Sequence, residues 1–183
     1  MRAVSIAPLF VLAPLVAFAQ QQFSPAENLA PYIPTPQTIV ERMLELGRVK
    51  PGDVVYDLGS GDGRIVITAA REFGARAVGV EIRPDLCRKA TERIQALGLE
   101  DRVRMIHASV FHVDLSTADV VTMYLLTSSN ERLKPTLEKY LKPGVRVVSN
   151  EFPIRGWKPV EMVLLKTGGS EHKIYLYEIG KTK

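Results

Sequence analysis

Short apolar runs alternate with amphipathic stretches along most of the chain. Five runs suit strands that are buried in a parallel sheet, and they lie at 53–58, 76–82, 102–107, 119–125 and 145–152. Before and between them, apolar positions recur at helical spacing over 36–48, 62–74, 84–98 and 130–141. Strands that alternate with helices in this way predict a mostly parallel sheet with helices on both faces.

The C-terminal part of the chain predicts a different connection. Two further strands, at about 159–166 and 172–179, are separated only by residues 167–170. Four residues cannot form a parallel crossover, so this pair must be an antiparallel hairpin. The predicted fold class is therefore α/β: a Rossmann-like seven-stranded sheet, mostly parallel, with a C-terminal antiparallel hairpin. Residues 153–158 leave no room for a helix before that hairpin.

The first 19 residues differ in kind from the rest. They begin Met1-Arg2, continue without a charge, and end Ala17-Phe18-Ala19. This pattern predicts a secretory signal peptide or an N-terminal anchor, and hence export or membrane anchoring on the periplasmic side. A start codon placed too early, on a cytoplasmic protein, is the alternative. The predicted organisation is a leader over 1–19, an N-terminal arm over 20–35 and one main domain over 36–183.

Composition narrows the choice of function classes. The chain has 183 residues, of which 46% are apolar and 24% charged, as expected for an α/β domain with a real core. A net charge of +4 is too small to indicate nucleic-acid binding. Cys87 is the sole cysteine, so neither an internal disulfide nor a zinc site is predicted. Any membrane contact would come through residues 1–19.

A glycine turn after the first predicted strand is the most informative feature. Asp57 lies near the strand end, and Gly59, Gly61 and Gly63 follow at alternate positions. Glycines let the backbone turn sharply and approach a ligand closely, with N–H groups of the next helix pointing at it. A P-loop motif is absent from the sequence, and a dinucleotide fingerprint would need glycine where Arg64 stands. The spacing is that of class I methyltransferases, which bind S-adenosylmethionine.

A second acidic residue follows where a nucleoside site would need it. Glu81 ends the next predicted strand, and an acid about 20 residues past such a turn accepts hydrogen bonds from ribose hydroxyls. Ser109 follows the third strand, where its hydroxyl can meet an adenine edge. Tyr124 ends the fourth strand and lines either the core or the channel for the methyl acceptor.

Several longer motifs resemble two families of lysine methyltransferases. They are Tyr32-Ile-Pro-Thr-Pro36, the segment 54–64, Val121-Thr-Met-Tyr-Leu-Leu-Thr127, Leu133-Lys-Pro-Thr-Leu-Glu138 and Glu151-Phe-x-Ile-x-Gly-Trp157. Together they resemble the archaeal-type protein lysine methyltransferases and the mitochondrial enzymes that methylate a lysine of the ATP synthase c-subunit. The resemblance covers about residues 31–180.

The resemblance implies a function and a set of site residues. It implies methyl transfer from S-adenosylmethionine to accessible lysines of partner proteins. The cofactor's methionine end would lie against Asp57, Gly59 and Gly61, and its ribose against Glu81. The adenine would lie along Ser109 and Val110. A lid would come from Tyr32 and Thr35. The acceptor lysine would lie near Tyr124 and Glu151.

Two alternatives stay open beside protein lysine. The acceptor can be a small molecule or RNA, because the small domain carries no added recognition module. The leader also leaves room for an exported, non-catalytic binding protein of the same fold, since members of these families do not usually begin with one. A monomer is expected in each case.

Overall fold

The structure is a computed structural model that describes residue 23 and residues 30–182. The predicted leader and most of the arm lie outside the described residues. Among the residues that are described, no helix has the length and apolar character that crossing a membrane requires.

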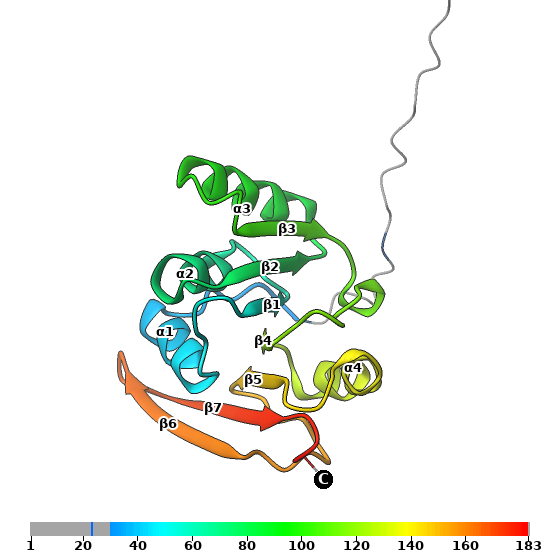
Figure 1. The fold of residues 1–183 in the computed structure, drawn as a ribbon. Coiled ribbons are helices and arrows are strands. Elements are labelled where there is room, and N and C mark those ends of the chain that lie inside the picture. The colour runs from blue at the N-terminus through cyan, green and yellow to red at the C-terminus, as the bar shows by residue number, and fades with distance from the viewer. Residues whose placement is uncertain (1–22, 24–29, 183) are drawn as a thin grey trace, which may run out of the picture.

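Four helices and seven strands make up the domain (Figure 1). The helices are α1 (Gln37–Leu46), α2 (Arg64–Phe73), α3 (Pro84–Ala96) and α4 (Thr127–Tyr140), with a short 3-10 helix η2 (Val110–His112). The strands are β1 (Val54–Leu58), β2 (Arg76–Glu81), β3 (Val103–His107), β4 (Val120–Met123), β5 (Arg146–Asn150), β6 (Glu161–Thr167) and β7 (Ser170–Glu178). Every predicted element is present. The fourth helix begins three positions earlier than predicted, and the fourth and fifth strands end two positions earlier.

All seven strands form one sheet in the order β3-β2-β1-β4-β5-β7-β6. The strands β1 to β5 pair in parallel, whereas β7 is antiparallel to both β5 and β6. The predicted fold class is thus confirmed. The first strand, β1, lies inside the sheet, with β2 and β3 on one side of it and β4 on the other. The strand order therefore reverses between β1 and β4. This switch point is where ligands of open α/β sheets bind.

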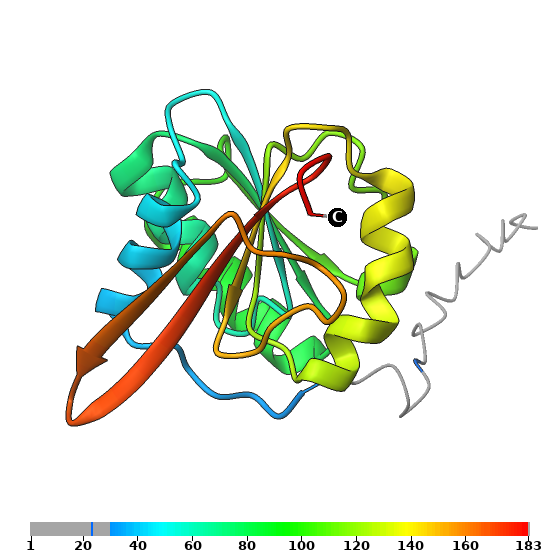
Figure 2. The same ribbon diagram turned by 90° about the horizontal axis from the view of Figure 1, so that it is seen from below.

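The hairpin of β6 and β7 extends beyond the rest of the sheet (Figure 2). Its turn is tighter than predicted, because Thr167 still pairs with Ser170 and only Gly168 and Gly169 connect the strands. Both glycines have positive φ, of 57° and 81°, as a two-residue hairpin turn with the right twist requires. No helix occurs between β5 and β6, in agreement with the prediction for that stretch.

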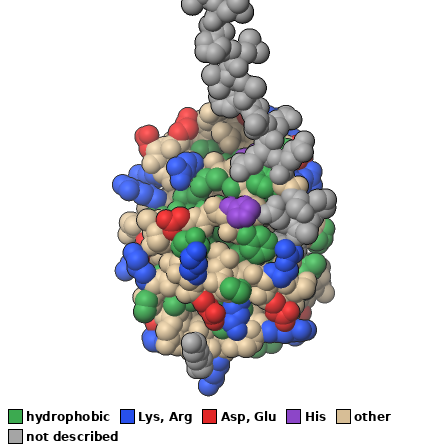
Figure 3. Space-filling view, turned by 90° about the vertical axis from the view of Figure 1, so that its right-hand side faces the viewer, with side chains coloured by type: hydrophobic (Ala, Val, Ile, Leu, Met, Phe, Trp, Pro, Cys, Tyr) green, Lys and Arg blue, Asp and Glu red, His purple; other side chains and the backbone are tan. Residues whose placement is uncertain are grey.

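Figure 3 shows the face toward which the arrowheads of β2 and β3 point in Figure 1. Apolar side chains gather near the middle of this face, and basic and acidic side chains are interspersed around them. Charges of both signs therefore surround the ligand-binding edge of the sheet.

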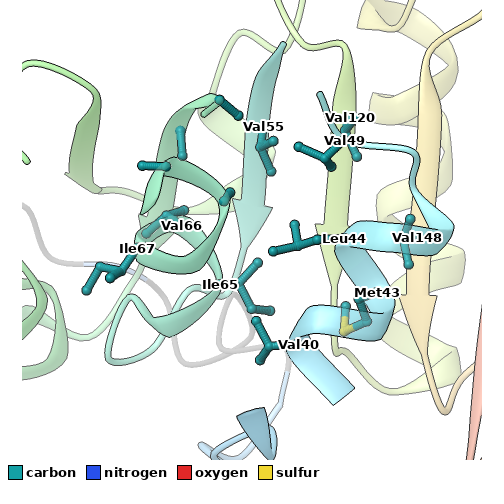
Figure 4. Packing of buried hydrophobic residues seen from close by; sticks show 14 of the residues in the cluster. Val40, Met43, Leu44, Val49, Val55, Ile65, Val66, Ile67, Val120 and Val148 are labelled. Atoms are coloured by element: carbon teal, nitrogen blue, oxygen red, sulfur yellow. The ribbon is translucent and has the colours of Figure 1, made fainter. Parts of the chain in front are cut away.

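Two apolar clusters, one on each face of the sheet, hold the domain together. On one face, Val40, Met43 and Leu44 of α1 pack with α2 against Val55 of β1 and Val148 of β5 (Figure 4). On the other face, α4 packs over a cluster that includes Leu133, Tyr177 and Trp157. Trp157 meets the Tyr177 ring edge-on and donates to Glu138 through Nε1 at 3.1 Å, so it is a packing anchor.

Candidate functional site

The glycine turn connects β1 to α2 at the switch point. Gly59, Gly61 and Gly63 all have left-handed backbone, with φ of 82°, 55° and 76°. Residues with a Cβ adopt these values only with strain, which explains why glycines stand at alternate positions. The N–H groups of Gly59 and Ser60 donate to the carbonyl of Val80 at 2.9 and 3.0 Å. These bonds fix the turn to the end of β2.

A pocket lies between this turn and the N-terminal segment 30–35. Its walls come from the lid segment, the glycine turn, the end of β2 and the end of β4. Of the ten predicted site residues, eight line it: Tyr32, Thr35, Asp57, Gly59, Gly61, Glu81, Val110 and Tyr124. The other two, Ser109 and Glu151, do not line it.

Asp57 is a buried acid at the bottom of the pocket, only 2% exposed. Thr122 Oγ1 donates to its Oδ1 at 2.8 Å. Burial raises the pKa of the Asp57 carboxyl to about 6, although the Thr122 hydroxyl lowers it, and the negative charges of Glu81 and Asp62 add to the rise. A ligand that brings a cation to this carboxylate would remove the unfavourable burial of its charge.

Glu81 joins the glycine turn to the start of the β2–α3 connection. Its Oε2 accepts from the Gly61 N–H at 2.7 Å, and its Oε1 accepts from the Arg83 N–H at 2.9 Å. A carboxylate has about four acceptor positions, so both oxygens can still accept from the hydroxyls of a ribose. Glu81 thus also orders the turn itself, a role that the spacing of the motif did not indicate.

The adenine end of the predicted site is formed by the segment after β3. Val110 begins η2 and lines the pocket, as predicted. Ser109, directly before it, is 0% exposed, and its hydroxyl has no partner among the described residues. Nearby, His107 contacts the Ile82 carbonyl through Nε2 at 3.1 Å, and the ring of Phe23 meets the His107 ring edge-on at 5.2 Å.

The segment 30–35 covers the turn, as the predicted lid would. A Cβ added to Gly61 would lie 2.6 Å from Cε2 of Tyr32, so the ring packs directly on the glycine. Thr35 is buried. Only a glycine at this position lets an aromatic ring and the backbone come so close.

Arg64 fastens this segment to the turn. Its Nη1 donates to the Thr35 carbonyl at 2.6 Å, while Nε and Nη2 donate to Asp62 at 2.8 and 2.7 Å. Burial raises the pKa of Asp62, but the bonds from Arg64 outweigh it and the pKa is lowered overall. The sequence showed Arg64 only as a departure from the dinucleotide motif, because its partner in the lid is a backbone carbonyl that no residue type reveals.

The predicted acceptor end consists of Tyr124, directly after β4, and the loop after β5. The rings of Tyr124 and Phe152 are stacked, with centroids 6.1 Å apart and an interplanar angle of 25°. Burial raises the pKa of Tyr124, and the negative charge of Glu151 raises it further. Tyr124 therefore lies between the cofactor pocket and the predicted acceptor carboxylate.

Glu151 has a left-handed backbone, with φ of 62°. For a residue other than glycine this conformation costs about 1–3 kcal/mol and persists only where the surroundings enforce it. The Glu151 N–H donates to the Lys173 carbonyl at 2.7 Å. The side-chain Oε1 of Glu151 lies 2.5 Å from Nδ1 of His172. The carboxylate is thus held against β7, by a histidine that the sequence did not single out.

Two polar side chains support the loop that carries Glu151. Ser149 Oγ and Asn130 Nδ2 both donate to the Phe152 carbonyl, at 2.6 and 3.0 Å. Asn130 comes from α4, so this helix helps to fix the acceptor end.

The pocket fits S-adenosylmethionine. The buried carboxylate of Asp57 suits the ammonium of the methionine end, and the left-handed turn at Gly59 and Gly61 lines the pocket beside it. Glu81 has acceptor capacity for the ribose. In residues 30–182 and at residue 23, no group of three His, Cys, Asp or Glu side chains is placed to hold a metal ion.

Comparisons with known proteins agree with this pocket. The family model of the ANTKMT methyltransferase domain matches residues 57–161. A protein-lysine N-methyltransferase of Saccharolobus islandicus is 53% identical over 154 residues, which are 84% of this chain and 96% of that protein. The mouse adenine nucleotide translocase lysine N-methyltransferase is 35% identical over 85% of this chain, and 66% of the mouse protein is covered.

A solved structure gives the same fold at high identity. It is an RNA methyltransferase from Salinibacter ruber in complex with S-adenosyl-L-homocysteine, 48% identical, with a TM-score of 0.76 over 80% of this chain and 94% of that one. S-adenosyl-L-homocysteine is the product that S-adenosylmethionine leaves after methyl transfer. The chain thus belongs to the ANTKMT methyltransferase domain family and is an S-adenosylmethionine-dependent methyltransferase.

Proposed function

We propose that this methyltransferase modifies lysine side chains of other proteins. The observation that carries the proposal is its 53% identity to a protein-lysine N-methyltransferase of which it covers 96%. The acceptor end is consistent with a cationic acceptor, because Tyr124 and Phe152 form an aromatic wall and Glu151 places a negative charge beside it. Aromatic faces and carboxylates both attract an ammonium group.

The pocket residues divide the cofactor between them in this proposal. Asp57, Gly59 and Gly61 hold the methionine end, and Glu81 accepts from the ribose hydroxyls. Ser109 and Val110 lie along the adenine. Tyr32 and Thr35 close the pocket, and Arg64 holds them in place through the Thr35 carbonyl. When bound, S-adenosylmethionine supplies a methyl group on a positively charged sulfonium.

On the acceptor side, the chain must deliver a neutral, aligned amine. A lysine in water has a pKa near 10.4, so its ammonium has to lose a proton before the nitrogen can attack. Glu151 favours the charged form of the lysine, whereas apolar walls and the positive sulfonium favour the neutral amine, so the proton leaves to water as the nitrogen moves from Glu151 toward the sulfonium. The stacked rings of Tyr124 and Phe152 form such a wall, and holding the amine in line supplies much of the remaining rate.

Methyl labelling tests the proposal. The purified protein is incubated with S-adenosylmethionine that carries a labelled methyl group, with mixed proteins in one arm and RNA in another. Label on lysines, located by mass spectrometry, is the expected result. Binding of the cofactor without label on any protein would contradict it.

RNA is a second candidate acceptor because of one specific relative. The Salinibacter ruber protein, described as an RNA methyltransferase, is 48% identical. Against this, the face in Figure 3 shows charges of both signs rather than a basic surface of the kind that binds phosphates. Label in the RNA arm alone would favour this candidate.

We further propose that residues 1–19 export or anchor the protein on the periplasmic side of a membrane, and that the catalytic domain acts as a monomer. The charge and apolar pattern of the leader supports this location. The need for S-adenosylmethionine, which is made in the cytoplasm, favours the cytoplasmic alternative. Mass spectrometry of the N-terminus in fractionated cells decides between them: a new start at Gln20 in the periplasm supports export, and an intact Met1 in the soluble cytoplasm contradicts it.

A further inference from the structure

The carboxylate of Glu151 is held by a residue from a distant part of the chain. Its Oε1 lies 2.5 Å from Nδ1 of His172, and its Oε2 accepts from the Lys173 N–H at a long 3.4 Å. Since a carboxylate can only accept, Nδ1 of His172 carries the hydrogen of this contact. We propose that His172 is a positioning residue, which orients the Glu151 carboxylate to receive the acceptor's ammonium; this rests on the proposed lysine acceptor.

Strand register explains how the two residues meet. Asn150 pairs with Ile174, so the next residue of the chain, Glu151, lies opposite Lys173 on β7. The Glu151 N–H donates to the Lys173 carbonyl, and this bond helps to hold the left-handed backbone of Glu151. Backbone and carboxylate of one residue therefore contact the same short piece of β7, which gives the carboxylate a single orientation.

The remaining hydrogen-bonding capacity of Glu151 points to a ligand. Oε1 is taken by the short bond to His172, whereas Oε2 has only the long contact with the Lys173 N–H. Both side chains are partly buried, at 17% and 21% exposed, so their interaction is little screened by water. Oε2 is thus the oxygen that can accept from an incoming ammonium, and the ring of the next residue, Phe152, stacks on Tyr124 of the pocket wall.

A purely structural role for the pair is the competing explanation. The hairpin has other support, because β7 pairs with β5 at five positions from Arg146 to Asn150 and packs Ile174 and Leu176 into the core. Fastening the hairpin therefore does not require His172. The two explanations differ in what a substitution changes: acceptor kinetics in one case and thermal stability in the other.

Four single variants of the full chain and one double variant, His172→Leu with Glu151→Gln, separate them, with poly-L-lysine as the methyl acceptor. His172→Leu removes the donor, and His172→Asn places an amide N–H near the position of Nδ1. Glu151→Gln removes the charge, and Glu171→Gln removes an exposed carboxylate from the same hairpin as a matched control. Each variant is measured for the acceptor KM, kcat, the Kd of S-adenosylmethionine and the melting temperature.

We expect His172→Leu to raise the acceptor KM about tenfold, the loss typical of a hydrogen bond to a charged group, with kcat changed less than about threefold. The asparagine variant should restore most of the KM, and the cofactor Kd should stay unchanged. In the Glu151→Gln background, His172→Leu should add nothing further, because the two residues act as one unit.

Two outcomes would overturn the inference while leaving the proposed function intact. One is a wild type that methylates poly-L-lysine beside a leucine variant with the same KM as the Glu171→Gln control. The other is a leucine variant that loses thermal stability and cofactor affinity together, with no rescue by asparagine. A wild type that binds the cofactor and methylates no lysine would overturn the proposed function, and this inference with it.

Discussion

The two ends of the site are built in opposite ways. The centre of the cofactor end is one continuous segment, the turn from Asp57 to Arg64, which is bonded to Glu81 at the end of the adjacent strand and covered by the lid segment 30–35. The predicted acceptor end combines Tyr124, Glu151 and His172, which come from three separate segments and meet because β5 pairs with β4 on one side and with β7 on the other. One end depends on local backbone conformation and the other on sheet topology. Substitutions should therefore act on them separately.

The largest effect is expected at the cofactor end, from Gly61→Val. The valine would have to adopt a φ of 55°, and its Cβ would meet the Tyr32 ring at 2.6 Å. We expect the affinity for S-adenosylmethionine to fall by about 2–4 kcal/mol, since backbone strain and displacement of the lid act together. Calorimetric titration of each protein with S-adenosylmethionine measures this loss of affinity.

Gly98→Val is the matched control for that substitution. Gly98 also has a positive φ, of 63°, but a Cβ at this position, just after α3, would have nothing within 4 Å. The valine should reduce thermal stability and leave cofactor affinity unchanged. Equal losses of affinity in both variants would show that the close contact with Tyr32 has no role in binding.

Glu81→Ala should follow in size. It removes the acceptor for the ribose hydroxyls and also leaves the N–H groups of Gly61 and Arg83 without their partner. The expected loss of cofactor affinity is about 1–3 kcal/mol. An affinity equal to that of the wild type would refute the assignment of Glu81 to the ribose.

The pH dependence of cofactor binding tests Asp57. Its pKa in the folded, ligand-free protein is about 6, raised by burial. The ligand's ammonium needs the ionised carboxylate, so affinity should weaken about tenfold for each pH unit below that value. The ligand-free protein should lose free energy of unfolding as the pH rises from about 4 to about 6, because over that range the unfolded chain ionises this carboxyl while the folded protein keeps it protonated. Asp57→Asn should remove both trends; a pH dependence that survives this substitution would contradict the assignment.

The smallest effect is expected from Arg64→Met, which keeps the side-chain stem and removes the bonds to Thr35 and Asp62. Cofactor affinity should fall about fivefold, mainly through faster dissociation, because the lid segment loses its fastening. Arg93→Met is the control, since Arg93 also approaches Asp62, at 3.7 Å, but does so from α3. A similar change in both variants would assign the effect to the charge on Asp62 instead.

The contrast between the two ends also explains what the sequence could predict. Periodicity predicted all seven strands and the antiparallel hairpin, because each strand is a short apolar run with a distinct boundary. The cofactor end was predictable because left-handed backbone selects glycine at 59, 61 and 63, and because Glu81 follows at a typical distance. At these positions the structure requires a particular residue type, glycine for a left-handed backbone or an acid for the ribose, so the sequence itself reveals the requirement.

Other features of the site could not be predicted from residue type. The left-handed residue at 151 is a glutamate rather than a glycine, and its contact with His172 depends on the register of an antiparallel pair. Arg64 binds the lid through a backbone carbonyl, which every residue has. Ser109 is fully buried with an unpartnered hydroxyl, which its residue type did not reveal, and its expected contact with the adenine stays a prediction. Such features follow from tertiary structure, so sequence pattern alone could not place them.

The central claim is that this site methylates lysine, and one measurement tests it most directly. The purified chain is incubated with S-adenosylmethionine and poly-L-lysine in one arm and RNA in the other, and both products are weighed by mass spectrometry, with Gly61→Val as the inactive control. We predict mass increments of one methylene on lysine with the wild type and none with the variant. Increments on RNA and none on lysine would contradict the claim.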